Sequence, residues 1–454
     1  IQSGGNYNVA VGDEAGTALT TGDNNVLIGY GAGSGITTGG NAVYIGYGAG
    51  ADGNASNNVG IGYDALGDAS LSTPNNVAIG LSALKALTSG GQNAAVGYQA
   101  GEALATGGGN AFVGYWAGKA CTGHCNTLIG ANAGKQATSE TGNTVVGTGA
   151  FAGAVSGGED NVAVGYAALP DVTSGDYNIG IGRNAGYSIT TGSRNIYIGS
   201  HSGGGTTEGA YNTAVGYAAL NAGTTANSNT AFGYYAGSVI TGGSNTIMGA
   251  YAGDAIGSGS DNVCYGYNAG SDITTGDNNL MLGHDAGASG SPGGSIGTAD
   301  NIIVLGDDNI STANIQVDWT VASDARDKTD FTDLDIGLDF INALKPYTYK
   351  WDKRIKYISE ENRGVEDLDT ITHDGTHKED WLDIGFKAQE VETLEKASGY
   401  KIEDKTNLTT SLTGDGKQYG IQYSKFVPIL VKAVQELSAT VTTLQQEIKT
   451  LKGD

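Results

Sequence analysis

The residues best suited to chemistry lie in one segment, V-A-S-D-A-R-D-K-T-D-F-T-D-L at residues 321–334, where Ser323 and Lys328 stand five positions apart. A serine hydroxyl is a weak nucleophile that needs a base. A lysine becomes such a base when burial or nearby positive charge lowers its pKa. Arg326 could supply that charge, whereas Asp327 would keep Lys328 protonated. On spacing alone, the simpler interpretation is favoured: Ser323 caps the following segment and Lys328 is a solvated charge.

Two other groups have metal-ligating side chains without a standard metal spacing. Cys121, His124 and Cys125 fall in one turn but lack a fourth ligand, so we expect free thiols or a local disulfide there. His373 and His377 lie in an acidic stretch that we expect to be exposed. No carboxylate pair has a spacing that indicates polysaccharide cleavage. We therefore expect neither a metal nor a cofactor.

The chain that positions these residues is strongly acidic. It carries 23 Lys and Arg against 47 Asp and Glu, a net charge of −24. Phosphates of nucleic acids and anionic membrane surfaces should repel it. No apolar run approaches the ~18 residues that cross a bilayer, so we expect no membrane insertion.

Residues 1–306 form a repeat array. The unit reads N-x-x-Φ-G-Y-x-A-G and recurs at a mean spacing of about 17 residues in 18 copies, the last of them spaced out. One copy has Ala42 in place of the Asn, and the last runs over residues 302–306. The Asn of the other copies is Asn8, Asn25, Asn58, Asn76, Asn93, Asn110, Asn126, Asn143, Asn161, Asn178, Asn195, Asn212, Asn229, Asn245, Asn262 and Asn279.

Each column of the repeat has a structural meaning. The third residue after the Asn is always apolar, the fourth is always Gly, and the seventh is almost always Ala. Short strands such as N-V-A-V cannot bury their apolar side alone, but stacked coils can pair each strand with the copies above and below. We expect Gly at a corner and a hydrogen-bonded ladder of Asn side chains. The fold class predicted is mainly β, a parallel β-roll or β-solenoid.

A tyrosine follows the Gly in nine copies: Tyr30, Tyr47, Tyr63, Tyr98, Tyr115, Tyr166, Tyr217, Tyr234 and Tyr267. Such a row can stack on sugars, or its rings can pack against each other or against a neighbouring chain. Packing is the favoured interpretation.

The repeat resembles the β-roll heads of trimeric autotransporter adhesins, through N-V-A-I-G at residues 76–80 and N-V-A-V-G at residues 161–165. The resemblance covers about two thirds of the chain and implies three chains side by side. The repeat is longer than is usual in those heads, and we expect no C-terminal membrane barrel of the kind those adhesins carry.

The remaining third is different in composition: it holds 18 of the 23 basic residues and only 9 of the 77 glycines. Four blocks occur in order: residues 321–334, L-K-P-Y-T-Y-K-W at 344–351, D-I-G-F-K-A-Q-E-V at 383–391, and Y-G-I-Q-Y-S-K-F-V-P-I-L-V-K-A-V-Q-E-L at 419–437. As a set they resemble the endosialidase-type C-terminal intramolecular chaperone of bacteriophage tail fibres and tailspikes. This resemblance implies an α+β chaperone domain.

The same resemblance implies self-cleavage. Members of that family cut their own chain before the serine of an S-D-x-x-x-K motif, which here falls on Ser323, Asp324 and Lys328. Ser323 and Lys328 would be the catalytic pair, and the cut would separate Ala322 from Ser323. The activity would be that of a serine endopeptidase acting only in cis, and no other enzymatic activity is expected.

The last 28 residues predict a parallel coiled coil. Apolar residues alternate at spacings of three and four through Val427, Leu430, Val434, Leu437, Val441, Leu444, Ile448 and Leu451. Val or Ile at position a with Leu at d favours two strands, whereas both resemblances imply three. We expect three, because a larger folded domain can override the preference of the zipper.

We expect a rod at 1–306, a connecting stem at 307–322, a chaperone core at 323–425 and a coiled-coil helix at 426–454. The resemblances imply a homotrimeric phage tail fibre or spike, located in the virion and assembled in the host cytoplasm. Its expected partners are a host-surface receptor, glycan among the candidates, and other tail or baseplate proteins bound through residues preceding Ile1. The alternatives are a glycan-degrading tailspike and a trimeric bacterial surface adhesin.

Overall fold

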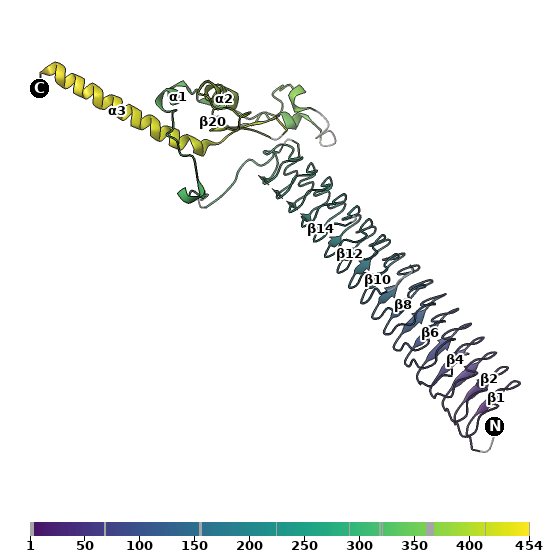
Figure 1. Cartoon of the computed structure of the whole chain (residues 1–454). Coiled ribbons are helices and arrows are strands. Elements are labelled where there is room, and N and C mark those ends of the chain that lie inside the picture. Colours follow the sequence, from purple (N-terminus) through teal and green to yellow (C-terminus); the bar gives the residue numbers. More distant parts are fainter. Residues whose placement is uncertain are drawn as a thin grey trace. The chain divides into compact units, whose positions relative to one another are not determined.

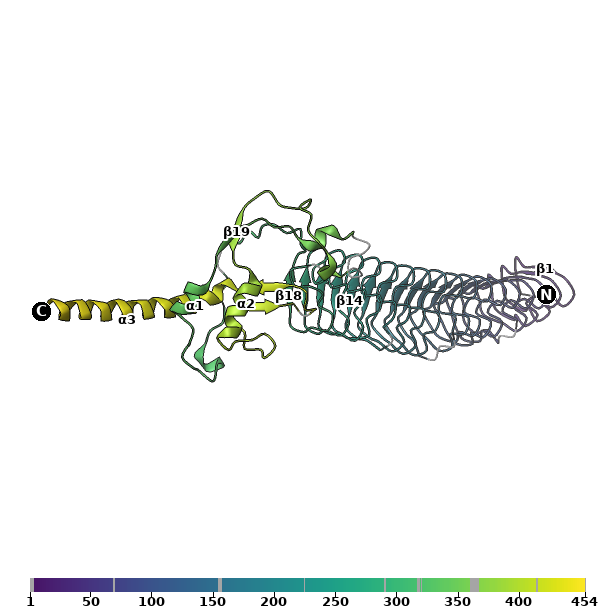
Figure 2. The ribbon, with the colours of Figure 1, turned by 90° about the horizontal axis from the view of Figure 1, so that it is seen from above.

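The computed structural model describes residues 4–67, 70–153, 157–223, 225–289, 291–316, 319, 321–359, 367–413 and 415–453. The chain divides into two units. One comprises Ile1–His284 and Thr298–Ile303, and the other comprises Asp285–Gly297 and Val304–Asp454. The first unit, here called the rod, is the column of arrows running from purple to teal in Figure 1 and is seen from above in Figure 2.

The rod is a parallel β-solenoid in which each coil contributes one three-residue strand. Every strand pairs in parallel and in register with the strand one repeat away, as Val162 does with Ile179. The 18 strands are β1 (Val9–Val11), β2 (Val26–Ile28), β3 (Val43–Ile45), β4 (Val59–Ile61), β5 (Val77–Ile79), β6 (Ala94–Val96), β7 (Ala111–Val113), β8 (Thr127–Ile129), β9 (Thr144–Val146), β10 (Val162–Val164), β11 (Ile179–Ile181), β12 (Ile196–Ile198), β13 (Thr213–Val215), β14 (Thr230–Phe232), β15 (Thr246–Met248), β16 (Val263–Tyr265), β17 (Leu280–Leu282) and β18 (Ile303–Leu305).

The expected asparagine ladder is present inside the rod. The backbone N–H of Asn178 donates to Oδ1 of Asn161 at 2.8 Å, and the same bond recurs between consecutive Asn residues along the stack. The side-chain amide of Asn178 in turn donates to the carbonyl of Gly192 at 2.9 Å. The ladder is interrupted at Ala42, because alanine offers no side-chain acceptor. Each buried Asn thus satisfies backbone groups that no strand pairing reaches.

The glycine four places after the Asn is required by its backbone conformation. Gly165 has φ of +135°, a region that side-chain-bearing residues rarely adopt. A Cβ on Gly165 would also lie 2.6 Å from the carbonyl oxygen of Gly182 in the next coil. From Gly12 to Gly266 the glycines therefore form a column of close backbone contacts at one corner of the coils.

Both faces of the strands are apolar, and one of them points outward. The residue two places after the Asn points into the coil interior and is fully buried, as at Leu27 and Phe112. Because side chains alternate along a strand, the residues one and three places after the Asn lie on the outer face. Stacking therefore does not bury the apolar third-place column as expected: Val96 and Val113 stay 38% and 40% exposed.

The tyrosine column follows the packing interpretation where the copies are consecutive. The rings of Tyr30 and Tyr47, and of Tyr47 and Tyr63, stack with centroids 5.1 Å apart. Tyr217 and Tyr234 stack at 5.4 Å. These rings remain 43–51% exposed along the edge of the outer face.

The second unit combines helices with two small antiparallel sheets. The core joins α1, α2 and α3 through Ile336, Phe340, Val391, Phe426 and Ile429. The elements are η1 (Ala325–Asp327), α1 (Leu338–Ala343), β19 (Tyr347–Tyr349), η2 (Arg354–Tyr357), η4 (Leu368–Thr370), β20 (Asp383–Gly385), α2 (Ala388–Ala397), β21 (Thr410–Leu412), β22 (Tyr419–Ile421), η5 (Tyr423–Lys425) and α3 (Phe426–Lys452). β19 pairs with β20, and β21 pairs with β22.

This architecture confirms the predicted fold class: a mainly β solenoid with a repeat of about 17 residues, followed by an α/β region that ends in a long helix. Among the residues that the structure describes, no helix has both the length and the apolar character to cross a membrane.

Candidate active site

The Ser323 segment is shaped by a single tight turn, η1. Asp324 precedes the turn in an extended conformation, and its carboxylate accepts a 2.9 Å hydrogen bond from the backbone N–H of Arg326. Asp324, not Ser323, is therefore the N-cap. The turn brings the chain back on itself, so that Nζ of Lys328 donates to Oγ of Ser323 at 2.5 Å. The structure thus brings together the two residues that the motif predicted as catalytic.

Arg326 does not take the position expected of it. Its guanidinium forms a fork with Asp324, through Nε at 3.1 Å and NH2 at 2.6 Å. The hydrogen bonds from Arg326 lower the pKa of Asp324, and the same contact raises the pKa of Arg326. The positive charge proposed to act on Lys328 is instead neutralised by its neighbour.

The Ser323–Lys328 pair is open to solvent. Every described residue from 309 to 333 is exposed, including the flanking Val321 at 81% and Phe331 at 72%. A lysine acts as a base when it is desolvated. Among the described residues of a single chain, nothing covers Lys328. The geometry is that of a nucleophile and base in hydrogen-bond reach, in an environment that does not yet activate the base.

Helix α3 has two apolar faces. One face packs in the core of the second unit through Phe426, Ile429 and Ala433. The predicted heptad residues form the other face, and each is 44–87% exposed: Val427, Leu430, Val434, Leu437, Val441, Leu444, Ile448 and Leu451. The helix therefore holds the domain with one face and leaves the heptad stripe open.

A contact of α3 that the motif analysis missed involves Glu436. Its carboxylate accepts a 2.7 Å hydrogen bond from the backbone N–H of Leu338, the first residue of α1. The heptad pattern gave one signal for it: Glu436 continues the three–four spacing of Phe426, Ile429 and Ala433 along the buried face.

The cysteine and histidine groups have structural explanations. Cys121 fills an interior position of its coil, where burial raises its pKa to about 11. Cys125 is exposed one residue before the Asn column. Nδ1 of His124 accepts a hydrogen bond from the backbone of Gly108 at 3.1 Å. The three side chains therefore lie in different environments: one in the coil interior, one exposed to solvent and one bonded to the backbone of the neighbouring coil.

His373 and His377 are exposed, as expected, and both lie beside the ring of Tyr357. The Tyr357 hydroxyl donates to Asp352 at 2.9 Å and accepts from the backbone N–H of Gly375 at 3.0 Å. This tyrosine organises the loop that carries the two histidines.

Comparison with known proteins adds one match. No curated protein is found to match the chain. Residues 323–399, which begin at Ser323 and include the turn, α1, β19, β20 and α2, match the family model described as chaperone of endosialidase.

Proposed function

We propose that this chain is a homotrimeric structural protein of the phage tail fibre or tailspike type, with a rod that serves host attachment and a C-terminal domain that directs trimeric folding. The observation that carries the proposal is the match to the endosialidase chaperone, which starts at Ser323 downstream of a repeat β-solenoid. The protein would act in the virion, bound to a host-surface receptor and to other tail proteins.

The outer face of the rod supports association of identical chains. Its two columns, one and three places after each Asn, hold only apolar residues and threonines over all 18 strands. At about 4.8 Å per coil the face is about 85 Å long and 10 Å wide, larger than the apolar patches usual on monomers. A face without charges in a chain of net charge −24 suits contact with copies of itself.

The heptad stripe of α3 supports the same assembly at the other end of the sequence. Eight apolar side chains at coiled-coil spacing are each at least 44% exposed in one chain. Coils of similar sequence specify register weakly, because a slip by one coil keeps most contacts between chains. A helical bundle at the C-terminus would fix the register of the three chains and raise their local concentration before the rods associate.

The proposed cleavage is an acyl transfer followed by hydrolysis. Oγ of Ser323 attacks the carbonyl carbon of Ala322 while the hydroxyl proton passes to neutral Lys328. Lys328 then returns the proton to the departing amide nitrogen of Ser323. The result is an ester between Ala322 and Oγ of Ser323 with a free α-amino group. Water hydrolyses the ester, leaving a carboxylate on Ala322 and a chain that begins at Ser323.

The exposure of the Ser323–Lys328 pair explains why cleavage would wait until the chains have assembled. Because Lys328 is solvated in a single chain, desolvation would have to come from a neighbouring copy. Cleavage would then follow assembly, and the finished rod would lose its folding template. The rod would then be kinetically stable: its lifetime would depend on how slowly it unfolds, not on the equilibrium between folded and unfolded chains.

The test is the intact mass of the purified protein on a denaturing column, measured beside Ser323→Ala. We expect a fragment of residues 323–454 from the wild type and one uncut chain from the variant. An uncut wild type would remove the peptidase from the proposal. Light scattering of the uncut Ser323→Ala chain tests the trimer separately, and a monomeric mass would contradict the proposed assembly.

A further inference from the structure

Residues Asp285–Gly297 interrupt the repeat between β17 and β18 and belong to the second unit, together with Val304–Asp454. They precede Ser323 in sequence. Cleavage at Ala322 would therefore leave this segment on the rod fragment, while the turn between β21 and β22 would leave with the chaperone fragment.

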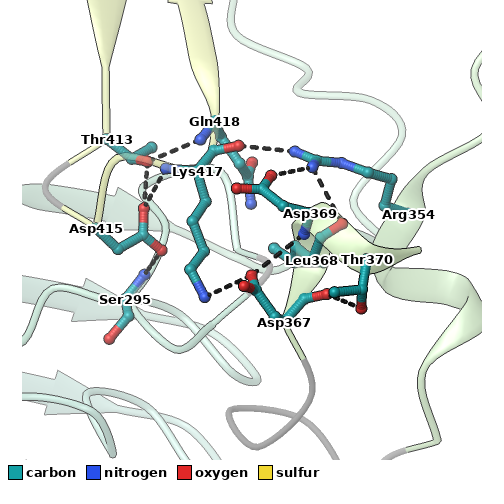
Figure 3. Close-up of polar contacts among 10 residues, drawn as sticks. All are labelled: Ser295, Arg354, Asp367, Leu368, Asp369, Thr370, Thr413, Asp415, Lys417 and Gln418. Carbon is teal, nitrogen blue, oxygen red and sulfur yellow. Dashed lines mark hydrogen bonds and ion pairs between the residues drawn. The ribbon is translucent and has the colours of Figure 1, made fainter.

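That turn holds the inserted segment through Asp415. Oδ2 of Asp415 accepts a 3.3 Å hydrogen bond from the backbone N–H of Ser295 (Figure 3). The backbone of Gly294 comes so close that an added Cβ would lie 3.0 Å from Thr413 and 3.1 Å from the Asp415 carboxylate. A close backbone approach of this kind needs glycine.

Asp415 is also held by residues of its own turn. Its other oxygen, Oδ1, accepts from the backbone N–H of Lys417 at 3.1 Å and from the hydroxyl of Thr413. The Thr413 hydroxyl in turn accepts from the backbone N–H of Gln418 at 3.1 Å. These bonds hold the carboxylate of Asp415 in the orientation in which Oδ2 accepts from the N–H of Ser295.

The turn is itself braced by η2 and η4, as Figure 3 shows. Arg354 donates to the carbonyl of Lys417 at 2.7 Å and to Asp369 at 2.8 Å. Nζ of Lys417 pairs with Asp367 at 3.0 Å. A second bond to a residue that precedes the proposed cut comes from Lys353, whose Nζ donates to the carbonyl of Asp308.

We propose that Asp415 and Lys353 form a clasp that keeps the cleaved chaperone bound to Ser295 and Asp308, which precede the cut. This inference rests on the proposed function, since it concerns what happens after the cut at Ala322. Each clasp uses a few hydrogen bonds to charged groups, so one alone is weak. Three clasps joined by the α3 helices act together and multiply the retention. Cleavage and release are then separate events.

The experiment follows the two fragments by size-exclusion chromatography under native conditions. We expect wild-type fragments to co-elute at 50 mM salt, because the three clasps act together. Asp415→Ala with Lys353→Met should release the chaperone fragment at least tenfold faster. Asp404→Ala, an exposed carboxylate of the same fragment, is the control and should behave as wild type.

A second variant protects the result against misfolding of the chaperone. Ser295→Pro lies on the rod fragment, removes the donated N–H and leaves the sequence of residues 323–454 unchanged. It should also speed release. Wild-type fragments that separate at once in low salt, or clasp variants that co-elute as long as the wild type, would overturn the clasp.

Self-cleavage and the clasp can be tested apart. A site-specific protease sequence inserted between Asn314 and Ile315, in the exposed segment, allows Ser323→Ala protein to be cut on demand. If this protein stays uncut until protease is added, and its fragments then co-elute only with the clasp intact, the clasp stands even if the wild type never cuts itself.

Discussion

Glu436 of α3 accepts a 2.7 Å hydrogen bond from the backbone N–H of Leu338, so the helix that carries the heptad stripe also caps the first turn of α1. Gly337 makes room for this contact, because a Cβ there would lie 2.4 Å from a Glu436 carboxylate oxygen. Helix α3 is therefore tied to α1 by this hydrogen bond as well as by the apolar core.

Replacing Glu436 should weaken the chaperone. Glu436→Ala leaves the amide of Leu338 without its acceptor, and loss of a helix cap costs about 1 kcal/mol, up to about 2. We expect a lower midpoint in thermal unfolding followed by circular dichroism at 222 nm. Glu447→Ala, an exposed residue of the same helix, is the control. Equal midpoints for the two variants would mean that the Glu436 contact does not stabilise the fold.

The glycine column predicts a sharp difference between two substitutions. Gly165→Ala places a Cβ 2.6 Å from the carbonyl oxygen of Gly182 at φ of +135°, so we expect the rod to lose soluble, folded yield. Gly31→Ala is the matched control: its φ is +64° and nothing lies within 4 Å of the added Cβ. It should cost only about 1 kcal/mol. Similar yields for the two variants would contradict the argument.

The rod was largely predictable from the sequence, because its repeat places the same residue types in every coil. The Asn ladder and the Gly corner follow from columns such as Asn178 and Gly165. The direction of the strand faces did not follow, since the apolar third-place residue was assumed to be covered by stacking. One signal was available in the sequence. The middle residue of each strand is also small or apolar, as Ala163 is between Val162 and Val164, so one of two apolar faces had to point outward.

The candidate site was predictable only in part. The motif named Ser323 and Lys328, and the structure places them 2.5 Å apart. The pairing of Arg326 with Asp324 could not be predicted from spacing, because the Arg326 side chain could equally have turned toward Lys328. The clasp joins Ser295 to Asp415 across 120 positions of sequence, a distance over which local patterns carry no information.

The chaperone should be more sensitive to acid than the rod. Hydrogen bonds from Lys417 and Tyr347 lower the pKa of Asp367 and Glu390 respectively. Lowered carboxyl pKa values give stability that is present above the unfolded value, near pH 4, and is lost as pH falls through the folded value. In the rod, burial raises the pKa of Asp254. A raised carboxyl pKa has the opposite effect, because protonation of that group at low pH favours the folded state.

Unfolding followed between pH 7 and pH 3 should therefore show the helical signal at 222 nm melting progressively earlier below pH 4, while the β signal of the rod changes less. Asp367→Asn should flatten the acid dependence of the helical transition. A rod that unfolds before the helices on acidification would contradict the assignment of these charges.

If the proposed cleavage occurs, Asp324 should position the turn between Ser323 and Lys328 through its cap rather than through its charge. Asp324→Asn keeps a side-chain oxygen for the N–H of Arg326 but releases the guanidinium, whereas Asp324→Ala removes both. We expect near wild-type cleavage from the first variant and slower cleavage from the second, measured as the mass fraction of residues 323–454 over time. Equal loss in both variants would assign the effect to the ion pair instead.

Lys328 should be irreplaceable by arginine. Lys328→Arg keeps a positive charge near Ser323, but a guanidinium does not give up its proton in proteins and cannot serve as the base. Loss of a general base typically costs about 10²–10⁴ in rate, so the variant should remain uncut on the time scale of wild-type cleavage. Lys378→Arg, at an exposed lysine in the same domain, should cleave normally. Cleavage of Lys328→Arg at the wild-type rate would show that the ammonium group only holds Ser323 in place, and that the base lies elsewhere.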